Sequence, residues 1–138
     1  MSLEKFWRNE QLQRIVALLP ITVLSAFIYY MSSIPANELP AFTQSVSDKL
    51  LHVAAFFVYG LSSQFAILGT FRTWSNNKTR VIALLIGASY GLLDELHQMV
   101  VPGRNSTYTD WIADVLGLML ALMFTHWLRG IFRGEEAI

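Results

Sequence analysis

Four long apolar runs constrain the fold of this chain more than any other feature. They cover residues 15–31, 50–71, 81–101 and 111–128. A helix needs about 20 mostly apolar residues to cross the hydrocarbon core of a bilayer. The composition agrees, since 54% of the residues are hydrophobic and 14% are charged, with a mean hydropathy of +0.42. Because backbone groups inside a bilayer must be hydrogen bonded within the protein, the sequence predicts an all-α, four-helix transmembrane bundle.

The remaining segments are the predicted head, tail and connections of this bundle. The expected parts are a head at residues 1–14, a membrane domain at residues 15–128 and a tail at residues 129–138. Pro35 and Pro40 predict a loop without helix over residues 32–47, and Pro102-Gly103 predicts a turn. We expect the first apolar run to be a retained helix, kinked at Pro20, because the cleavage pattern of a secretory signal is poor.

Lysine and arginine are concentrated on one side of the predicted bundle. In the head, the middle loop and the tail they are Lys5, Arg8, Arg14, Arg72, Lys78, Arg80, Arg129 and Arg133. The opposite side carries only Lys49 and Arg104. Because cytoplasmic loops are enriched in Lys and Arg, we predict a multi-pass protein of the cytoplasmic membrane with both termini inside. Trp7, Trp74 and Trp127 lie near that same side, as interfacial anchors do.

The bulk composition also narrows the class of partner. The formal net charge is zero, so no basic surface indicates nucleic acid. The chain has no cysteine, which excludes disulfides and thiolate metal sites. Two histidines and four acids could together hold a divalent metal ion, but no motif such as HExxH supports one, so we expect no metal and no cofactor.

Polar residues gather at those ends of three apolar runs that an antiparallel bundle brings together. They are Asp48, Lys49 and His52 in the second run, Asp94, Glu95, His97 and Gln98 in the third, Arg104 in the turn, and Asp110 and Asp114 in the fourth. Ionisable groups at membrane depth are costly and usually functional. The sequence therefore predicts one polar pocket at the outer end of the bundle.

Helical periodicity indicates how these residues face one another. Asp94 and Gln98 share one face of the third run, and Asp114 and Gly117 share a stripe of the fourth. A carboxylate that faced lipid would be expensive, so we expect these faces to turn inward. Small residues such as Gly117 and Ala121 would let the helices approach closely beneath the pocket.

Structural roles compete with function for several of these residues. Asp110 is well placed to be only the N-cap of the last helix. Asp94 and Glu95 would form a purely structural ion-paired cluster if Lys49 and Arg104 neutralised them. The sequence leaves both interpretations open beside the functional one.

The order and spacing of these residues resemble the VanZ-like family of small integral membrane proteins. The pattern is Asp48-Lys49-x-x-His52, Asp94-Glu95-x-x-Gln98, Pro102-Gly103-Arg104, Asp110 and Asp114-x-x-Gly117. Many members carry Asn near the start of the last helix, where this chain has Asp114 and Gly117. The resemblance implies a four-helix protein of the cell envelope, and the founding member is linked to resistance to the glycopeptide antibiotic teicoplanin.

Three functions are compatible with the predicted pocket. The first is binding of a membrane-lipid or cell-wall precursor headgroup by Asp48, Lys49, His52, Asp94, Glu95, Gln98, Arg104, Asp110 and Asp114. The second is an interfacial enzyme with His52 and Asp94 or Glu95 as general base and Arg104 stabilising negative charge. The third, a proton-coupled transporter, is less favoured because the chain has no internal repeat. The oligomeric state stays open.

Overall fold

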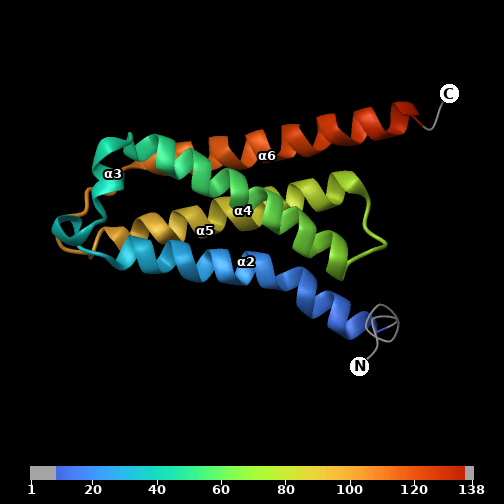
Figure 1. Ribbon diagram of the computed structural model, residues 1–138, viewed down its shortest axis with the longest axis horizontal. Coiled ribbons are helices and arrows are strands. Elements are labelled where there is room, and N and C mark those ends of the chain that lie inside the picture. The colour runs from blue at the N-terminus through green and yellow to red at the C-terminus, as the bar shows by residue number, and fades with distance from the viewer. Residues whose placement is uncertain (1–8, 136–138) are drawn as a thin grey trace.

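The protein is an antiparallel bundle of four long helices, as the computed structural model of residues 9–135 shows (Figure 1). The helices are α2 (Glu10–Ser33), α4 (Asp48–Thr70), α5 (Asn76–Gln98) and α6 (Tyr108–Glu135). The described residues contain no strand. The beginning of α2 and the end of α6 lie at the same end of the bundle, and the α2–α4 and α5–α6 connections lie at the other (Figure 1). The predicted all-α bundle is confirmed.

The helices begin earlier than the apolar runs because polar residues form their first turns. In α2 the Asn9 side chain accepts hydrogen bonds from the backbone N–H groups of Gln11 and Leu12, at 3.1 and 3.2 Å. This N-cap starts the helix at Glu10, inside the predicted polar head. The helix stays continuous through Pro20 and bends toward its N-terminal end (Figure 1).

The connection between α2 and α4 is more ordered than predicted. It contains a 3-10 helix, η1 (Ala36–Glu38), and a short α-helix, α3 (Ala41–Ser45). Each follows a proline, Pro35 and Pro40 respectively. Proline ends a preceding helix, but its fixed φ also suits the start of a new one. The prediction of a loop without helix was therefore wrong for residues 36–38 and 41–45.

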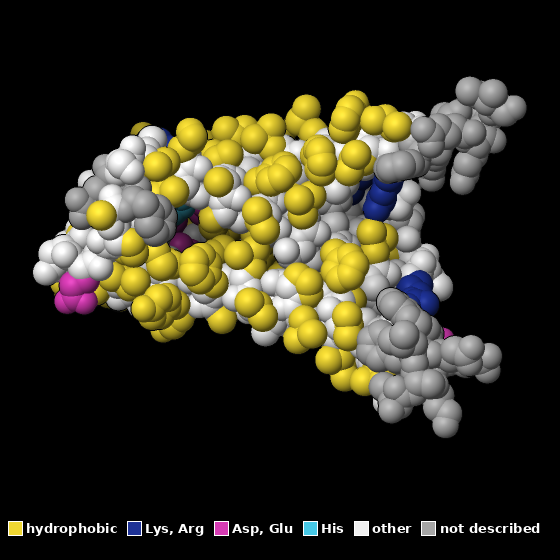
Figure 2. All heavy atoms as spheres, viewed as in Figure 1, with side chains coloured by type: hydrophobic (Ala, Val, Ile, Leu, Met, Phe, Trp, Pro, Cys, Tyr) yellow, Lys and Arg dark blue, Asp and Glu magenta, His cyan; other side chains and the backbone are white. Residues whose placement is uncertain are grey.

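Three of the four long helices are long and apolar enough to cross a membrane. They are α2, α4 and the part of α6 at Tyr108–Ile131. The fourth long helix, α5, is not among them; it carries Lys78 and Arg80 near one end and Asp94 and Glu95 near the other. Hydrophobic side chains cover most of the surface seen in Figure 2, and Lys and Arg are visible at the end where α2 begins. The bundle therefore presents an apolar exterior, as a membrane requires.

Glycines let α4 and α6 pack closely. A Cβ at Gly60 would lie 2.8 Å from the Cβ of Ala121, and one at Gly117 would collide with the Val53 carbonyl oxygen and lie 2.9 Å from the Phe57 nitrogen. The backbone of α6 therefore runs directly against that of α4 at Gly117. This contact holds α4 and α6 together just below the pocket, as predicted for small residues there.

We predict that Gly117→Ala destabilises the protein by about 1–3 kcal/mol, because the methyl group would force two backbones apart. Thermal unfolding in detergent, followed by circular dichroism, measures this loss. Gly130→Ala is the matched control on the same helix, because a Cβ there meets nothing within 4 Å. Equal stability of the two variants would contradict the close α4–α6 contact.

Candidate functional site

The polar residues predicted to converge do meet at one end of the bundle. Five of them are almost fully buried there, with exposures of 5% for Asp94, 5% for Glu95, 6% for Gln98, 3% for Asp110 and 0% for Asp114. They come from the last turns of α5 and the first turns of α6. The first turns of α4 contribute Asp48, Lys49 and His52. The site is therefore built from three helices at one depth.

Lys49 and Asp110 join the beginnings of α4 and α6. The Lys49 ammonium group donates to Asp110 Oδ1 at 2.8 Å and to the Thr109 hydroxyl at 2.9 Å. Asp110 Oδ2 accepts from the Thr107 backbone N–H at 3.1 Å and from its hydroxyl at 2.6 Å. Thr107 immediately precedes α6, so Asp110 occupies the third helical position, as in a capping box. The N-cap interpretation of Asp110, left open from the sequence, is therefore off by position, because Thr107 is the N-cap and Asp110 binds its backbone N–H and hydroxyl.

His52 lies between acidic residues of α5 and α6. Its Nδ1 is 2.8 Å from Asp114 Oδ1 and 3.7 Å from Glu95 Oε1. Its Nε2 is 4.0 Å from Asp48 Oδ1, on the more exposed side of the ring. Ser106 donates to Glu95 Oε2 at 2.6 Å and so fixes the orientation of that carboxylate. This hydrogen-bonded group ties the three helices together.

Asp94 and Arg104 have partners other than those predicted. Gln98 donates to Asp94 Oδ2 at 3.0 Å and lies 3.4 Å from the Ser32 hydroxyl. Arg104 donates from Nη2 to the Met31 carbonyl at 3.2 Å, and its buried Nε has no hydrogen-bond partner. Within residues 9–135, no carboxylate comes within ion-pair distance of Arg104.

The ion-paired cluster considered from sequence is consequently not formed as expected. Lys49 pairs with Asp110 rather than with Asp94 or Glu95. Asp94 is satisfied by a neutral amide, that of Gln98. The physical reason is geometric: Lys49 lies at the start of α4, beside the start of α6, so the nearest carboxylate belongs to α6.

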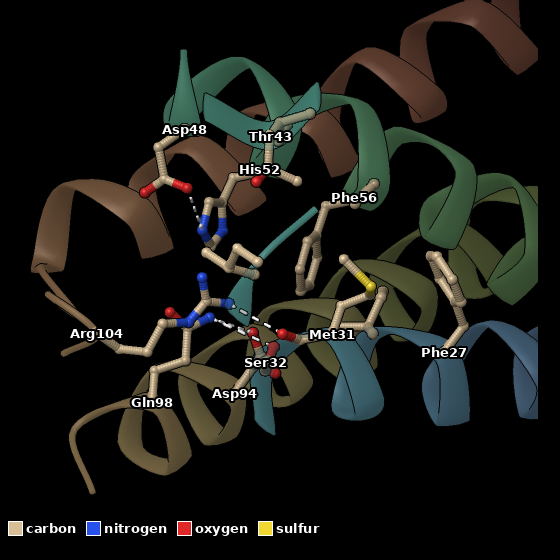
Figure 3. A pocket seen from close by; sticks show the side chains of 14 residues that line it. Phe27, Met31, Ser32, Thr43, Asp48, His52, Phe56, Asp94, Gln98 and Arg104 are labelled. Carbon is tan, nitrogen blue, oxygen red and sulfur yellow. Dashed lines mark hydrogen bonds and ion pairs between the residues drawn. The ribbon is translucent and has the colours of Figure 1, made fainter. Parts of the chain in front are cut away.

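A cavity of about 340 Å³ lies between α2, α4, α5 and the two connections at this end. Its lining residues are Phe27, Ile28, Met31, Ser32, Leu39, Thr43, Asp48, Leu51, His52, Ala55, Phe56, Asp94, Gln98 and Arg104. In Figure 3, Arg104, Gln98 and Asp94 lie together at one end, while Phe27 and Phe56 lie toward the other. The cavity thus has a polar end and an apolar end.

The cavity opens on the side of the bundle, between α2 and α4. Figure 2 shows a hollow near the α3 end, with acidic and histidine side chains at its bottom and hydrophobic side chains around its rim. Because the long axis of the bundle is the one that would cross the membrane, this opening faces sideways rather than along the membrane normal.

The nine predicted site residues divide into two groups. Five of them line the cavity: Asp48, His52, Asp94, Gln98 and Arg104. The other four lie behind it against α6: Lys49, Glu95, Asp110 and Asp114. His52 belongs to both groups, since it lines the cavity and contacts Asp114. His97, the remaining polar residue of α5, packs on the Tyr29 ring and lies 3.0 Å from the Ser33 hydroxyl, which gives it a structural role.

Several residues of the site were not predicted. Ser106 and Thr107 orient two of the acids, and the spacing Thr107-x-x-Asp110 is a capping-box signal that was available in the sequence. Ser32, Met31 and Phe27 bring α2 into the cavity. No local pattern marks these three, because an apolar helix gives no sign of which face will border a polar site.

A family model described as VanZ/LLP1 matches residues 2–129 of the chain. No curated protein and no solved structure matches this chain.

We predict that Lys49 and Asp110 are energetically coupled and that Lys49 and Asp94 are not. In a double-mutant cycle with Lys49→Ala and Asp110→Asn, the two losses of melting temperature should sum to more than the loss of the double variant, because either change alone breaks the same ion pair. The cycle of Lys49→Ala with Asp94→Asn is the control and should be additive. Coupling in the second cycle alone would contradict the observed pairing.

Proposed function

Because the chain belongs to the VanZ/LLP1 family and has three helices of membrane-spanning length and composition, it is a membrane protein, and we propose that it binds the phosphate-bearing headgroup of an envelope lipid or lipid-linked cell-wall precursor. The binding site is the cavity between α2, α4 and α5. The protein is a multi-pass protein of the cytoplasmic membrane, with this cavity near the outer face.

Arg104 is the observation that carries the proposal. Its guanidinium group borders the cavity, its Nε has no hydrogen-bond partner, and it makes no ion pair with any described carboxylate. Arginine is suited to phosphate because its planar fork donates two parallel hydrogen bonds. An unpaired arginine at the polar end of a cavity therefore favours an anionic group on the ligand.

The rest of the cavity favours a lipid over a soluble phosphate. Phe27 and Phe56 line the part of it away from Arg104 (Figure 3), where an acyl or prenyl chain would bury apolar surface. The volume of about 340 Å³ lies at the lower end of the range for small-molecule sites. It accommodates a headgroup and the first carbons of a chain, and the side opening lets the remainder extend into the bilayer. Asp94 and Gln98 would accept or donate hydrogen bonds to hydroxyl or amine groups on the headgroup.

We predict that lipid with a phosphate-bearing headgroup copurifies with the wild-type protein and is reduced about tenfold or more in Arg104→Gln. The reason is the loss of a charge-assisted hydrogen bond worth about 1.5–3 kcal/mol. Native mass spectrometry of the full chain, incubated with a glycerophospholipid or with a polyprenyl-phosphate precursor, measures the binding and separates the two sources.

Arg72→Gln is the matched control, because Arg72 is exposed at the opposite end of the bundle. Ala55→Leu is a second test variant, since it fills the cavity without removing charge. Wild-type lipid binding in both Arg104→Gln and Ala55→Leu would contradict the proposed site.

The orientation of the bundle is a separate part of the proposal. It rests on the excess of Lys and Arg at the end where α2 begins. Lys5, Arg8 and Trp7, which contributed to that prediction, lie outside the described residues.

We predict that a cysteine at Asn105 reacts with a membrane-impermeant thiol reagent in intact cells, whereas one at Asn77 does not. Both positions are exposed, so the difference reports the side of the membrane rather than burial. The chain has no cysteine of its own that would add background labelling. If only the cysteine introduced at position 77 were labelled, the cavity would lie at the cytoplasmic face.

A second function, an interfacial enzyme acting on the same headgroup, is favoured by one specific observation. His52 borders the cavity while its Nδ1 contacts Asp114 at 2.8 Å, which is the arrangement of an orienting carboxylate behind a general base. The distinguishing variant is His52→Gln. Loss of headgroup turnover with unchanged lipid binding would support the enzyme, whereas absence of turnover in the wild-type protein would exclude it in favour of binding alone.

The proposed role in the cell follows from the site together with the family. Headgroup binding at the outer face would place the protein among those that alter the response of the envelope to glycopeptide antibiotics such as teicoplanin. This role rests on the family resemblance.

A further inference from the structure

Behind the cavity, three side chains from three helices converge on one point. His52 of α4, Glu95 of α5 and Asp114 of α6 each offer a ligand atom, and these atoms all lie within 4.8 Å of one another. We infer that these three residues bind a divalent metal ion of the Mn²⁺ or Zn²⁺ class. This inference does not depend on the proposed headgroup binding.

The spacing of the three ligand atoms suits a metal. His52 Nδ1 is 2.8 Å from Asp114 Oδ1 and 3.7 Å from Glu95 Oε1. Two ligands held about 2.1 Å from one ion lie about 3.0 Å apart at octahedral angles and about 3.4 Å apart at tetrahedral angles. These two distances bracket both values, and the third pair of ligand atoms, on Glu95 and Asp114, lies within 4.8 Å, so an ion would be bound after side-chain shifts that bring the two carboxylates closer together.

Unsatisfied oxygens provide the second, independent observation. Glu95 Oε1 and Asp114 Oδ2 are buried and have no hydrogen-bond partner, in side chains that are 7% and 0% exposed. Glu95 Oε1 is the oxygen directed at His52. Burying a carboxylate without a full set of partners is costly, and more so in a membrane bundle. A divalent cation held by Glu95 Oε1 and by both oxygens of Asp114 would satisfy both acids at once.

Neighbouring residues already provide the outer layer that metal ligands usually have. Ser106 donates to Glu95 Oε2 at 2.6 Å, which leaves Oε1 available. The second ring nitrogen of His52 faces Asp48 Oδ1 at 4.0 Å. Such second contacts orient a ligating carboxylate and fix the nitrogen that a histidine presents to the ion. Gly91 leaves room for Asp114, because a Cβ there would lie 2.8 Å from Asp114 Oδ2.

The donor set restricts the choice of ion. One imidazole nitrogen and two carboxylates suit Zn²⁺ or Mn²⁺, while Ca²⁺ takes six to eight oxygens in ordinary sites. No cysteine is present to favour a softer ion. His52 also borders the cavity, so the ion would lie one side chain away from whatever the cavity holds.

Metal titration of the purified full chain in detergent tests this inference. After treatment with EDTA and its removal, the wild-type protein should bind about one Mn²⁺ or Zn²⁺ per chain, and Ca²⁺ should not compete. Glu95→Gln and Asp114→Asn should weaken that binding by at least about tenfold, since each replaces an anionic ligand. Glu38→Gln, an exposed acid at the same end of the bundle, is the control and should bind as the wild type does.

A spectroscopic measurement keeps the test decisive if the ligand variants fail to fold. Pulsed electron paramagnetic resonance of bound Mn²⁺ should detect one histidine nitrogen. That signal should persist when His97 and His126, the other two histidines, are both replaced by Gln. Absence of saturable binding by the folded wild-type protein overturns the inference. Loss of the nitrogen signal in the His97→Gln/His126→Gln variant, or undiminished binding in folded Glu95→Gln and Asp114→Asn, also overturns it.

Discussion

The cost of burying carboxylates inside an apolar bundle governs the arrangement of this structure. Asp114 is fully buried in the second turn of α6, and its Oδ1 contacts His52 on α4 at 2.8 Å. Asp110 forms an ion pair with Lys49, which also belongs to α4. Since a charge without a partner is expensive at membrane depth, the rotation and register of α4 and α6 are constrained by these two contacts. The close approach at Gly117 then makes both contacts geometrically possible.

This tight α4–α6 pair explains why the cavity lies on the opposite side. Glycine and alanine bring α6 against α4, whereas α2 borders the site with large side chains, among them Phe27 and Met31. The space between α2 and α4 stays partly unfilled at this end, and Ser32 of α2 approaches only the Gln98 amide that binds Asp94. Glu95, Asp110 and Asp114 therefore lie behind the cavity, while Asp48 and Asp94 line it, and the cavity is open toward α2. The His52 side chain lies between the two parts of the site: it lines the cavity on one side and contacts Asp114 and Glu95 on the other.

The sequence was sufficient to predict the helices and the convergence, but not the pairing. Apolar runs locate helices because their length and composition must match a bilayer. Antiparallel topology then brings Asp48, Asp94 and Asp114 to one end without further information. Pairing depends on helix rotation and loop path to within a few ångströms, so the sequence did not indicate that Lys49 pairs with Asp110. The part played by α2 was missed, because its cavity-facing residues resemble its lipid-facing ones.

The position of His52 determines how the two parts of the site would influence each other. Its Nδ1 faces Asp114 and Glu95, while the ring also borders the cavity. Any cation at the two acids, whether a proton on His52 or a metal ion, adds positive charge beside the space that Arg104 lines. Electrostatic interactions are strong where water is excluded, so that charge would favour an anionic headgroup. Neutralising the acids would therefore also prepare the cavity for phosphate, and binding at one part would strengthen binding at the other.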